Sequence, residues 1–314
     1  MAELTTGLKQ RFAKDYKLPI KLYTEPYFTE RIEALDFLYG SKKSYNTFVE
    51  ELKDFTDEDS YFFYYKEIKE TIMNHIKSKP EFEKFNTVDI KEWEVPKKFL
   101  ELPSKDIYHQ SNIGRTFISI DMKKANFSSM SCFDSKIFDN CETWEDFIST
   151  FTKSQHIINS KYIREVILGN CNPKRQVAYE KYLMSALFLE LEELHLPVVF
   201  FSNDEIIYDV TDIENKEATY NMIVTLLEGA KIPLRIEIFF LQGIMCEDKY
   251  IGYIKQIGIG SSMPRTMDIK KLNPMYIMPV IKTINGQPIE YSDLVFDYEG
   301  VLCKMVNAPT ITIT

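Results

Sequence analysis

The chain has 314 residues, of which 45% are hydrophobic and 27% charged, a composition close to that of folded globular domains. No apolar run approaches the ~20 residues of a membrane span, and the start of the chain has no basic stretch followed by an apolar one, so we expect a cytoplasmic protein without membrane contact. The five cysteines and four histidines are scattered without zinc-ligand spacing, which predicts free, buried thiols.

The net charge of −9 argues against broad contact with nucleic acid, because phosphate contacts depend on Lys and Arg. The charge is unevenly distributed. Between Lys153 and Lys181 there are six basic and two acidic residues, a local balance of +4. Acidic residues elsewhere are most simply a solvated surface that keeps the protein soluble. Any phosphate contact is therefore expected on this basic segment.

The first hundred residues have helical periodicity with many aromatic positions. Amphipathic helices are predicted at Thr29–Tyr39, Tyr45–Phe55 and Ser60–Ile76. The aromatic run Phe62–Tyr65 has the chemistry to stack on bases, although aromatic residues at helical spacing more often belong to a core. A linker rich in Pro and Lys follows, and it predicts a helical region at 1–105, a mixed region at 106–241 and a β-rich appendage at 242–314.

The middle region has the element order βαββαβ. Strands are predicted at Thr116–Ile120, Val198–Phe201, Glu205–Val210 and Leu234–Phe240, and helices at Thr143–Thr150, Ser160–Leu168, Gln176–Leu194 and Lys216–Glu228. This is the order of a ferredoxin-like α+β fold, whose helices cover one face of an antiparallel sheet and leave the other face open to a ligand.

Carboxylates follow two of these apolar strands. Asp121 comes directly after the first strand, and Asp204 lies in the turn between the second and third. The βαββαβ order places both on adjacent central strands, near enough to share two metal ions ~3.5–4 Å apart. Mg²⁺, or Mn²⁺ in its place, prefers such oxygen ligands. The alternative is that each Asp is only a cap or turn residue.

Two motifs resemble those of polymerase palm domains. The segment Ser119–Phe127 is similar to the first metal-binding motif, in which a residue five positions after the Asp packs against the sugar of the incoming nucleotide; the resemblance implies this role for Asn126. Val199–Ile206 is similar to the His-Asp-Glu motif of family A DNA polymerases and, more loosely, to the Tyr-x-Asp-Asp turn of reverse transcriptases. Asn203 departs from both, since it replaces the family A His and the first reverse-transcriptase Asp.

A basic helix lies between the two motifs. Lys161 and Arg164 fall on one edge of it, and Gly169 is expected to end it. The segment is similar to the nucleotide-binding helix of family A enzymes, which implies that these cations neutralise a triphosphate as charge moves to the leaving pyrophosphate. The following turn adds Lys174 and Arg175. The alternative is that all four are ordinary surface cations.

The chain after residue 241 is predicted to be strand-rich. Leu234–Phe240 pairs with Tyr250–Ile257 as one hairpin, and Tyr276–Ile284 pairs with Gln287–Tyr291 as another across an Asn-Gly turn. Such a β region has the means to grip a primer-template duplex, or to dock a protein partner by adding a strand.

The resemblance covers roughly residues 115–240 and implies that 106–241 is a palm-like catalytic domain. The preferred function is nucleotidyl transfer to a nucleic-acid 3′ end, with two metal ions on Asp121 and Asp204, Glu205 as an outer ligand or primer contact, and nucleic acid and nucleoside triphosphates as partners. One alternative is a catalytically degenerate palm-derived protein that binds nucleic acid or a replication partner. Another is an unrelated α+β protein-interaction module, which explains the acidic charge directly.

Overall fold

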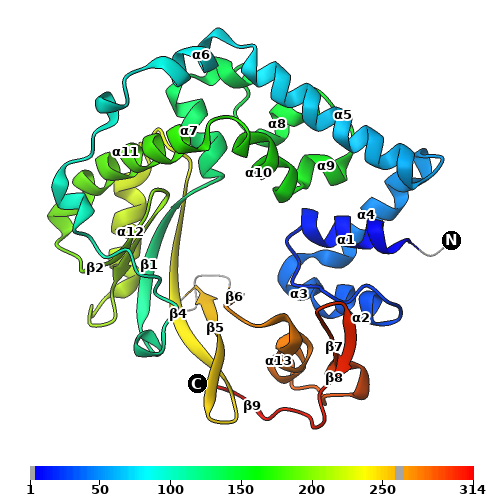
Figure 1. Ribbon diagram of the computed structural model, residues 1–314. Coiled ribbons are helices and arrows are strands. Elements are labelled where there is room, and N and C mark those ends of the chain that lie inside the picture. Colours follow the sequence, from blue (N-terminus) through cyan, green and yellow to red (C-terminus); the bar gives the residue numbers. More distant parts are fainter. Residues whose placement is uncertain (1–3, 259–264) are drawn as a thin grey trace.

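The computed structural model describes residues 4–258 and 265–314 (Figure 1). It confirms the α+β class, with a large antiparallel sheet and a helical layer that together form a ring-like arrangement in Figure 1. Among the described residues, the sheet contains β1 (Thr116–Met122), β2 (Val198–Phe201), β3 (Glu205–Asp209), β4 (Leu234–Cys246), β5 (Lys249–Ile257), β6 (Thr266–Lys270) and β9 (Ile311–Ile313).

The strand order in the sheet is β2-β3-β1-β4-β5-β6, and β9 pairs with the far end of β4. Every pairing is antiparallel. The first four strands therefore have the order of a ferredoxin-like unit, as the sequence predicts, with β1 between β3 and β4. This order brings the carboxyl end of β1 beside the β2–β3 turn.

Helices α11 (Pro173–Leu191) and α12 (Lys216–Leu227) cover one face of this unit. Side chains alternate across a strand, so Ile118, Ile120 and Met122 of β1 point to one face and join a core with Met184 of α11 and Ile223 of α12. Asp121 belongs to the opposite set of β1 side chains. Strand β1 is thus held in place by the packing of α11 and α12 on one face of the sheet. The Asp121 side chain is directed away from these two helices.

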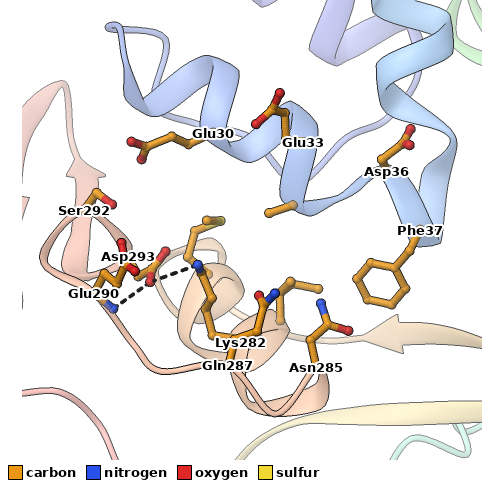
Figure 2. Close-up of a pocket in the computed structure, with 13 residues that line it drawn as sticks. Glu30, Glu33, Asp36, Phe37, Lys282, Asn285, Gln287, Glu290, Ser292 and Asp293 are labelled. Atoms are coloured by element: carbon orange, nitrogen blue, oxygen red, sulfur yellow. Dashed lines mark hydrogen bonds and ion pairs between the residues drawn. The ribbon is translucent and has the colours of Figure 1, made fainter.

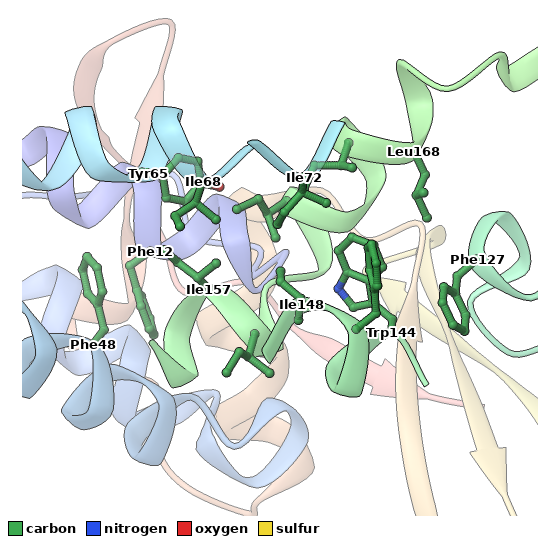
Figure 3. Packing of buried hydrophobic residues seen from close by; sticks show 14 of the residues in the cluster. Phe12, Phe48, Tyr65, Ile68, Ile72, Phe127, Trp144, Ile148, Ile157 and Leu168 are labelled. Atoms are coloured by element: carbon green, nitrogen blue, oxygen red, sulfur yellow. The ribbon is translucent and has the colours of Figure 1, made fainter. Parts of the chain in front are cut away.

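A second helical layer combines residues from before and after β1. It contains α1 (Thr6–Asp15), α2 (Tyr27–Ala34), α3 (Asp36–Tyr39), α4 (Ser41–Glu51), α5 (Glu58–Lys77), α6 (Pro80–Thr87), α7 (Ala125–Phe133), α8 (Trp144–Ser149), α9 (Gln155–Asn159) and α10 (Lys161–Gly169). Figure 3 shows Phe12, Phe48 and Tyr65 packed in one cluster with Ile157 and Leu168. The boundary predicted near residue 105 therefore separates segments of sequence that share one hydrophobic core.

The aromatic run on α5 belongs mainly to this core. Tyr61 and Tyr65 are buried in it, and Phe62 and Tyr64 pack against it. Phe63 is 67% exposed and points away from the core. This alternation follows from helical periodicity, because only positions about three or four apart share a face.

The C-terminal region differs in part from the prediction. The β4–β5 hairpin is present, and it continues the central sheet. The predicted second hairpin is wrong, because residues Ile277–Ile284 form the helix α13. Pro279 falls in the first turn of this helix, where its missing N–H is not needed. Gly286 has a φ of 64° and closes the helix end, so the Asn-Gly pair acts as a C-terminal stop and not as a hairpin turn.

A small separate hairpin, β7 (Val295–Tyr298) with β8 (Val301–Lys304), follows α13.

No helix in residues 4–258 and 265–314 has both the length and the apolar character needed to cross a membrane. All five cysteines are free, as predicted, although only Cys171 is buried.

Candidate active site

A cavity of about 620 Å³ lies where β1, the β2–β3 turn, α10 and α11 meet. Its polar lining comes from five elements and the turn, and includes Asp121, Lys124, Asn126, Lys161, Arg164, Glu165, Glu180, Asp204 and Arg235. Five of the residues chosen from sequence are among these. Segments more than a hundred residues apart thus contribute to one site.

The backbone holds the two predicted aspartates together. The carbonyl of Asp204 accepts a hydrogen bond of 2.8 Å from the Met122 N–H, which ties the β2–β3 turn to the end of β1. The Ser202 hydroxyl donates to Asp204 Oδ1 at 2.9 Å and orients that carboxylate. Asp121 and Asp204 both line the cavity.

The Asp121 carboxylate interacts electrostatically with both Arg235 and Asp204. Burial raises the pKa of Asp121, the Arg235 guanidinium opposes this rise, and the Asp204 carboxylate adds to it. Arg235 Nη2 donates to Asp121 Oδ2 at 2.7 Å. The Arg235 side chain is 53% exposed, so it has room to leave Asp121 when a cationic ligand competes for the same oxygen.

Glu180 is a third carboxylate in the cavity, and the sequence analysis missed it. It extends from α11, is only 4% exposed, and accepts a hydrogen bond of 2.5 Å from Asn203 Nδ2. Burial raises the pKa of Glu180 to about 7, with a smaller contribution from Asp204. The sequence contained a signal for a buried carboxylate, because Glu180 lies one helical turn before Met184 on the apolar stripe of its helix, where a charged residue is unusual.

Helix α10 supplies the positive side of the cavity. The Arg164 side chain is half-buried, and among the described residues its Nε has no hydrogen-bond partner. Burial lowers the pKa of Lys161, and the nearby Arg164 lowers it further. Two cations are therefore held close together beside the carboxylates, at an energetic cost that an anionic ligand would remove.

Asn126 lies near the start of α7 and also lines the cavity. Its side-chain oxygen accepts the Phe127 N–H at 3.0 Å, which leaves its amide NH₂ available as a donor. The chain reaches this position through Lys124, whose φ of 49° turns the backbone out of β1.

Glu205 occupies a neighbouring position on the sheet. It lies opposite Asp121 in the β1–β3 register, and the Ser119 hydroxyl donates to it at 2.5 Å. Burial raises the pKa of Glu205. It lines a smaller pocket with Tyr108 and Phe200 and not the main cavity. This position fits an outer role better than direct ligation.

Lys174 and Arg175 are corrected by the structure, since neither lines the cavity. Arg175 Nε donates to the carbonyl of Phe85 at 2.7 Å, and the guanidinium lies 4.9 Å from the centre of the Trp93 ring. Lys174 is exposed at the start of α11. The cause is the turn after α10, where Asn172 has a φ of 60° and redirects the chain.

A second cavity, of about 580 Å³, lies between α2, α3 and α13 (Figure 2). Its charged lining is mostly acidic and includes Glu30, Glu33, Asp36, Lys282, Glu290 and Asp293. Lys282 is directed toward Asp293, 3.8 Å away. An anionic substrate would meet repulsion here, so this cavity does not compete with the first as a phosphate site.

The metal-binding capacity of the first cavity is limited to oxygen donors. Among the described residues, no group of three or more His, Cys, Asp or Glu side chains is arranged to hold a metal ion. Mg²⁺ is commonly bound by one or two carboxylates together with substrate phosphates. Asp121 and Asp204 match that donor set if a nucleotide supplies the remaining ligands.

Neither protein-family models nor curated proteins match this sequence. The function is therefore inferred from the chemistry of the cavity, in which the carboxylates of Asp121 and Asp204 lie beside the cations of Lys161 and Arg164 on α10.

Proposed function

We propose that the protein is a nucleotidyltransferase that adds nucleotides to the 3′ end of a nucleic acid. The observation that carries this proposal is the joint lining of one cavity by Asp121 and Asp204 from the sheet and by Lys161 and Arg164 from α10. Phosphoryl transfer depends on positioning and charge stabilisation, and it uses carboxylates for metal ions and cations for phosphates.

Asp121 and Asp204 would hold Mg²⁺ or Mn²⁺. When bound, these ions activate the 3′-hydroxyl and stabilise an in-line transition state. Arg164 and Lys161 would bind the triphosphate oxygens and stabilise the charge that develops on the leaving pyrophosphate. The Asn126 amide, which lines the same cavity, would donate to the ribose, and Glu205 would support the Asp121 end of β1 from the neighbouring strand.

Arg235 would act as an exchangeable counterion. It neutralises Asp121 through the 2.7 Å contact, and a divalent ion would compete for the same oxygen. The released guanidinium would remain beside the cavity, where it can contact a phosphate.

The test is incorporation of labelled nucleotides into a primed template with Mg²⁺ or Mn²⁺. Asp121→Asn and Asp204→Asn preserve side-chain shape and remove charge, and each should abolish incorporation. Asp212→Asn is the matched control, because it removes one carboxylate from an exposed position outside the cavity. Activity that persists in both cavity variants would refute the proposal.

The second candidate is a palm-derived protein that binds nucleic acid without catalysis. The observation that favours it is the pairing of Asp121 with Arg235, together with Asn203 at a position where a reverse-transcriptase turn has a ligand. In that case the wild type incorporates nothing under any template, primer or metal condition, and both Asn variants bind nucleic acid as well as the wild type does.

A protein partner is proposed for the β7–β8 hairpin, where Tyr298, Val301 and Leu302 are exposed.

A cytoplasmic location stays a prediction from the sequence.

A further inference from the structure

A basic groove of about 560 Å³ lies beside Tyr162 of α10. It is formed by the end of α1, the extended segment 18–23 and one residue of α10. The polar side chains that line it are Gln10, Lys14, Lys17, Lys21, Tyr23 and Tyr162. Among the described residues that line it there is no carboxylate. The three lysines are all exposed, whereas Ala13, Leu18 and Ile20 form a buried floor.

The groove is positively charged in a protein whose net charge is −9. Lys14 Nζ lies 4.3 Å and Arg11 Cζ 4.5 Å from the centre of the Tyr162 ring. The hydrogen bond with Lys14 lowers the pKa of Tyr162. The Lys14 and Arg11 cations beside the Tyr162 ring create a local positive field, which attracts phosphate groups.

The groove adjoins the candidate active site through α10. Tyr162 lines the groove, and its neighbours Lys161 and Arg164 line the cavity. An ion pair between Lys17 of the groove and Glu165 of the cavity joins the two. This ion pair marks the point where the groove meets the cavity.

We propose that this groove binds the sugar-phosphate backbone of a single-stranded nucleic acid and leads that strand to the cavity. The role of the strand rests on the proposed function, but binding itself is a separate property. A groove lined by three lysines and two tyrosines matches the way single strands are bound, by backbone neutralisation with aromatic contacts.

The test measures binding of fluorescent oligothymidine and oligouridine of about 20 nucleotides, longer than a typical single-strand site. The variant is the triple substitution Lys14→Gln, Lys17→Gln and Lys21→Gln, measured across a range of salt concentrations. The matched control is Lys91→Gln, Lys97→Gln and Lys105→Gln, which removes the same charge from exposed positions outside both the groove and the cavity. Thermal melting verifies that both variants fold.

Each lost phosphate contact on a single strand lowers the slope of log K against log salt by about 0.7. The groove variant should therefore lose about 2 from this slope and on the order of 100-fold in affinity near 0.1 M salt, while the control binds like the wild type. Wild-type affinity and slope in the groove variant would overturn the inference, as would an equal loss in the control.

This result is independent of catalysis. If the wild type incorporates no nucleotide but the groove variant binds the oligonucleotide more weakly than the wild type, the proposed enzymatic activity is refuted and the groove proposal stands. An active wild type whose groove variant binds and incorporates normally refutes the groove and retains the enzyme.

Discussion

Glu180→Gln should make the protein more stable at neutral and alkaline pH. The side chain is 4% exposed, and burial raises the pKa of Glu180 from 4.5 to about 7. Below the unfolded pKa both states are protonated, so the carboxyl has no effect. Above it the unfolded state ionises first and binds fewer protons, so the free energy of unfolding falls as pH rises toward 7.

The size of this loss follows from the shift in pKa. At 1.36 kcal/mol for each pKa unit, the loss reaches about 3 kcal/mol once the folded carboxyl is ionised. In the wild type, Glu180 accepts a hydrogen bond of 2.5 Å from Asn203 Nδ2. Glutamine has the same shape and its side-chain oxygen can accept the same hydrogen bond, but it cannot ionise. The stability gain of the variant should therefore grow from near zero at about pH 4 to about 3 kcal/mol at about pH 8.

Urea unfolding at several pH values, with a chelator present, measures this difference. Glu190→Gln is the matched control, because Glu190 is an exposed residue on the same helix. A difference between Glu180→Gln and wild type that is constant with pH would refute the reasoning.

Three further substitutions separate structural from functional residues. Asp15 is fully buried and accepts hydrogen bonds of 2.8 Å from both Tyr65 and His156, so Asp15→Ala should lower the free energy of unfolding by about 3–5 kcal/mol, and a loss below 1 kcal/mol in urea would contradict this. Arg164→Ala should raise the nucleotide KM about 10-fold or more with an unchanged Tm, because it removes a charge-assisted phosphate contact. Arg175→Ala should lower stability by about 1.5–3 kcal/mol with an unchanged KM, since its contacts are to backbone carbonyls; a raised KM would return it to the site.

Strands β1 to β4 could be predicted because their signals are local. Strand β2 begins and ends at the predicted residues, and β1, β3 and β4 begin where predicted. The order of these elements also placed Asp121 and Asp204 together, since β1 and β3 are neighbours in the predicted sheet. Alternating apolar residues and turn residues specify these features without distant contacts.

The failures arose where two local signals were compatible with the same residues. Asn285-Gly286 suits both a hairpin turn and a helix end, and burial of Ile277 and Ile281 in the helical core selected the helix. Arg175 follows a basic helix in sequence, but the turn at Asn172 directs it to α6.

The sequence by itself determined the α+β class, the strand order and the pair of aspartates, because periodicity and element order act over short distances. Only the tertiary structure decided that Glu180 joins them and that Lys14 of α1 lies beside Tyr162 of α10. These contacts join segments far apart in the chain. Their geometry follows from how helices pack into a shared core, and no local pattern encodes it.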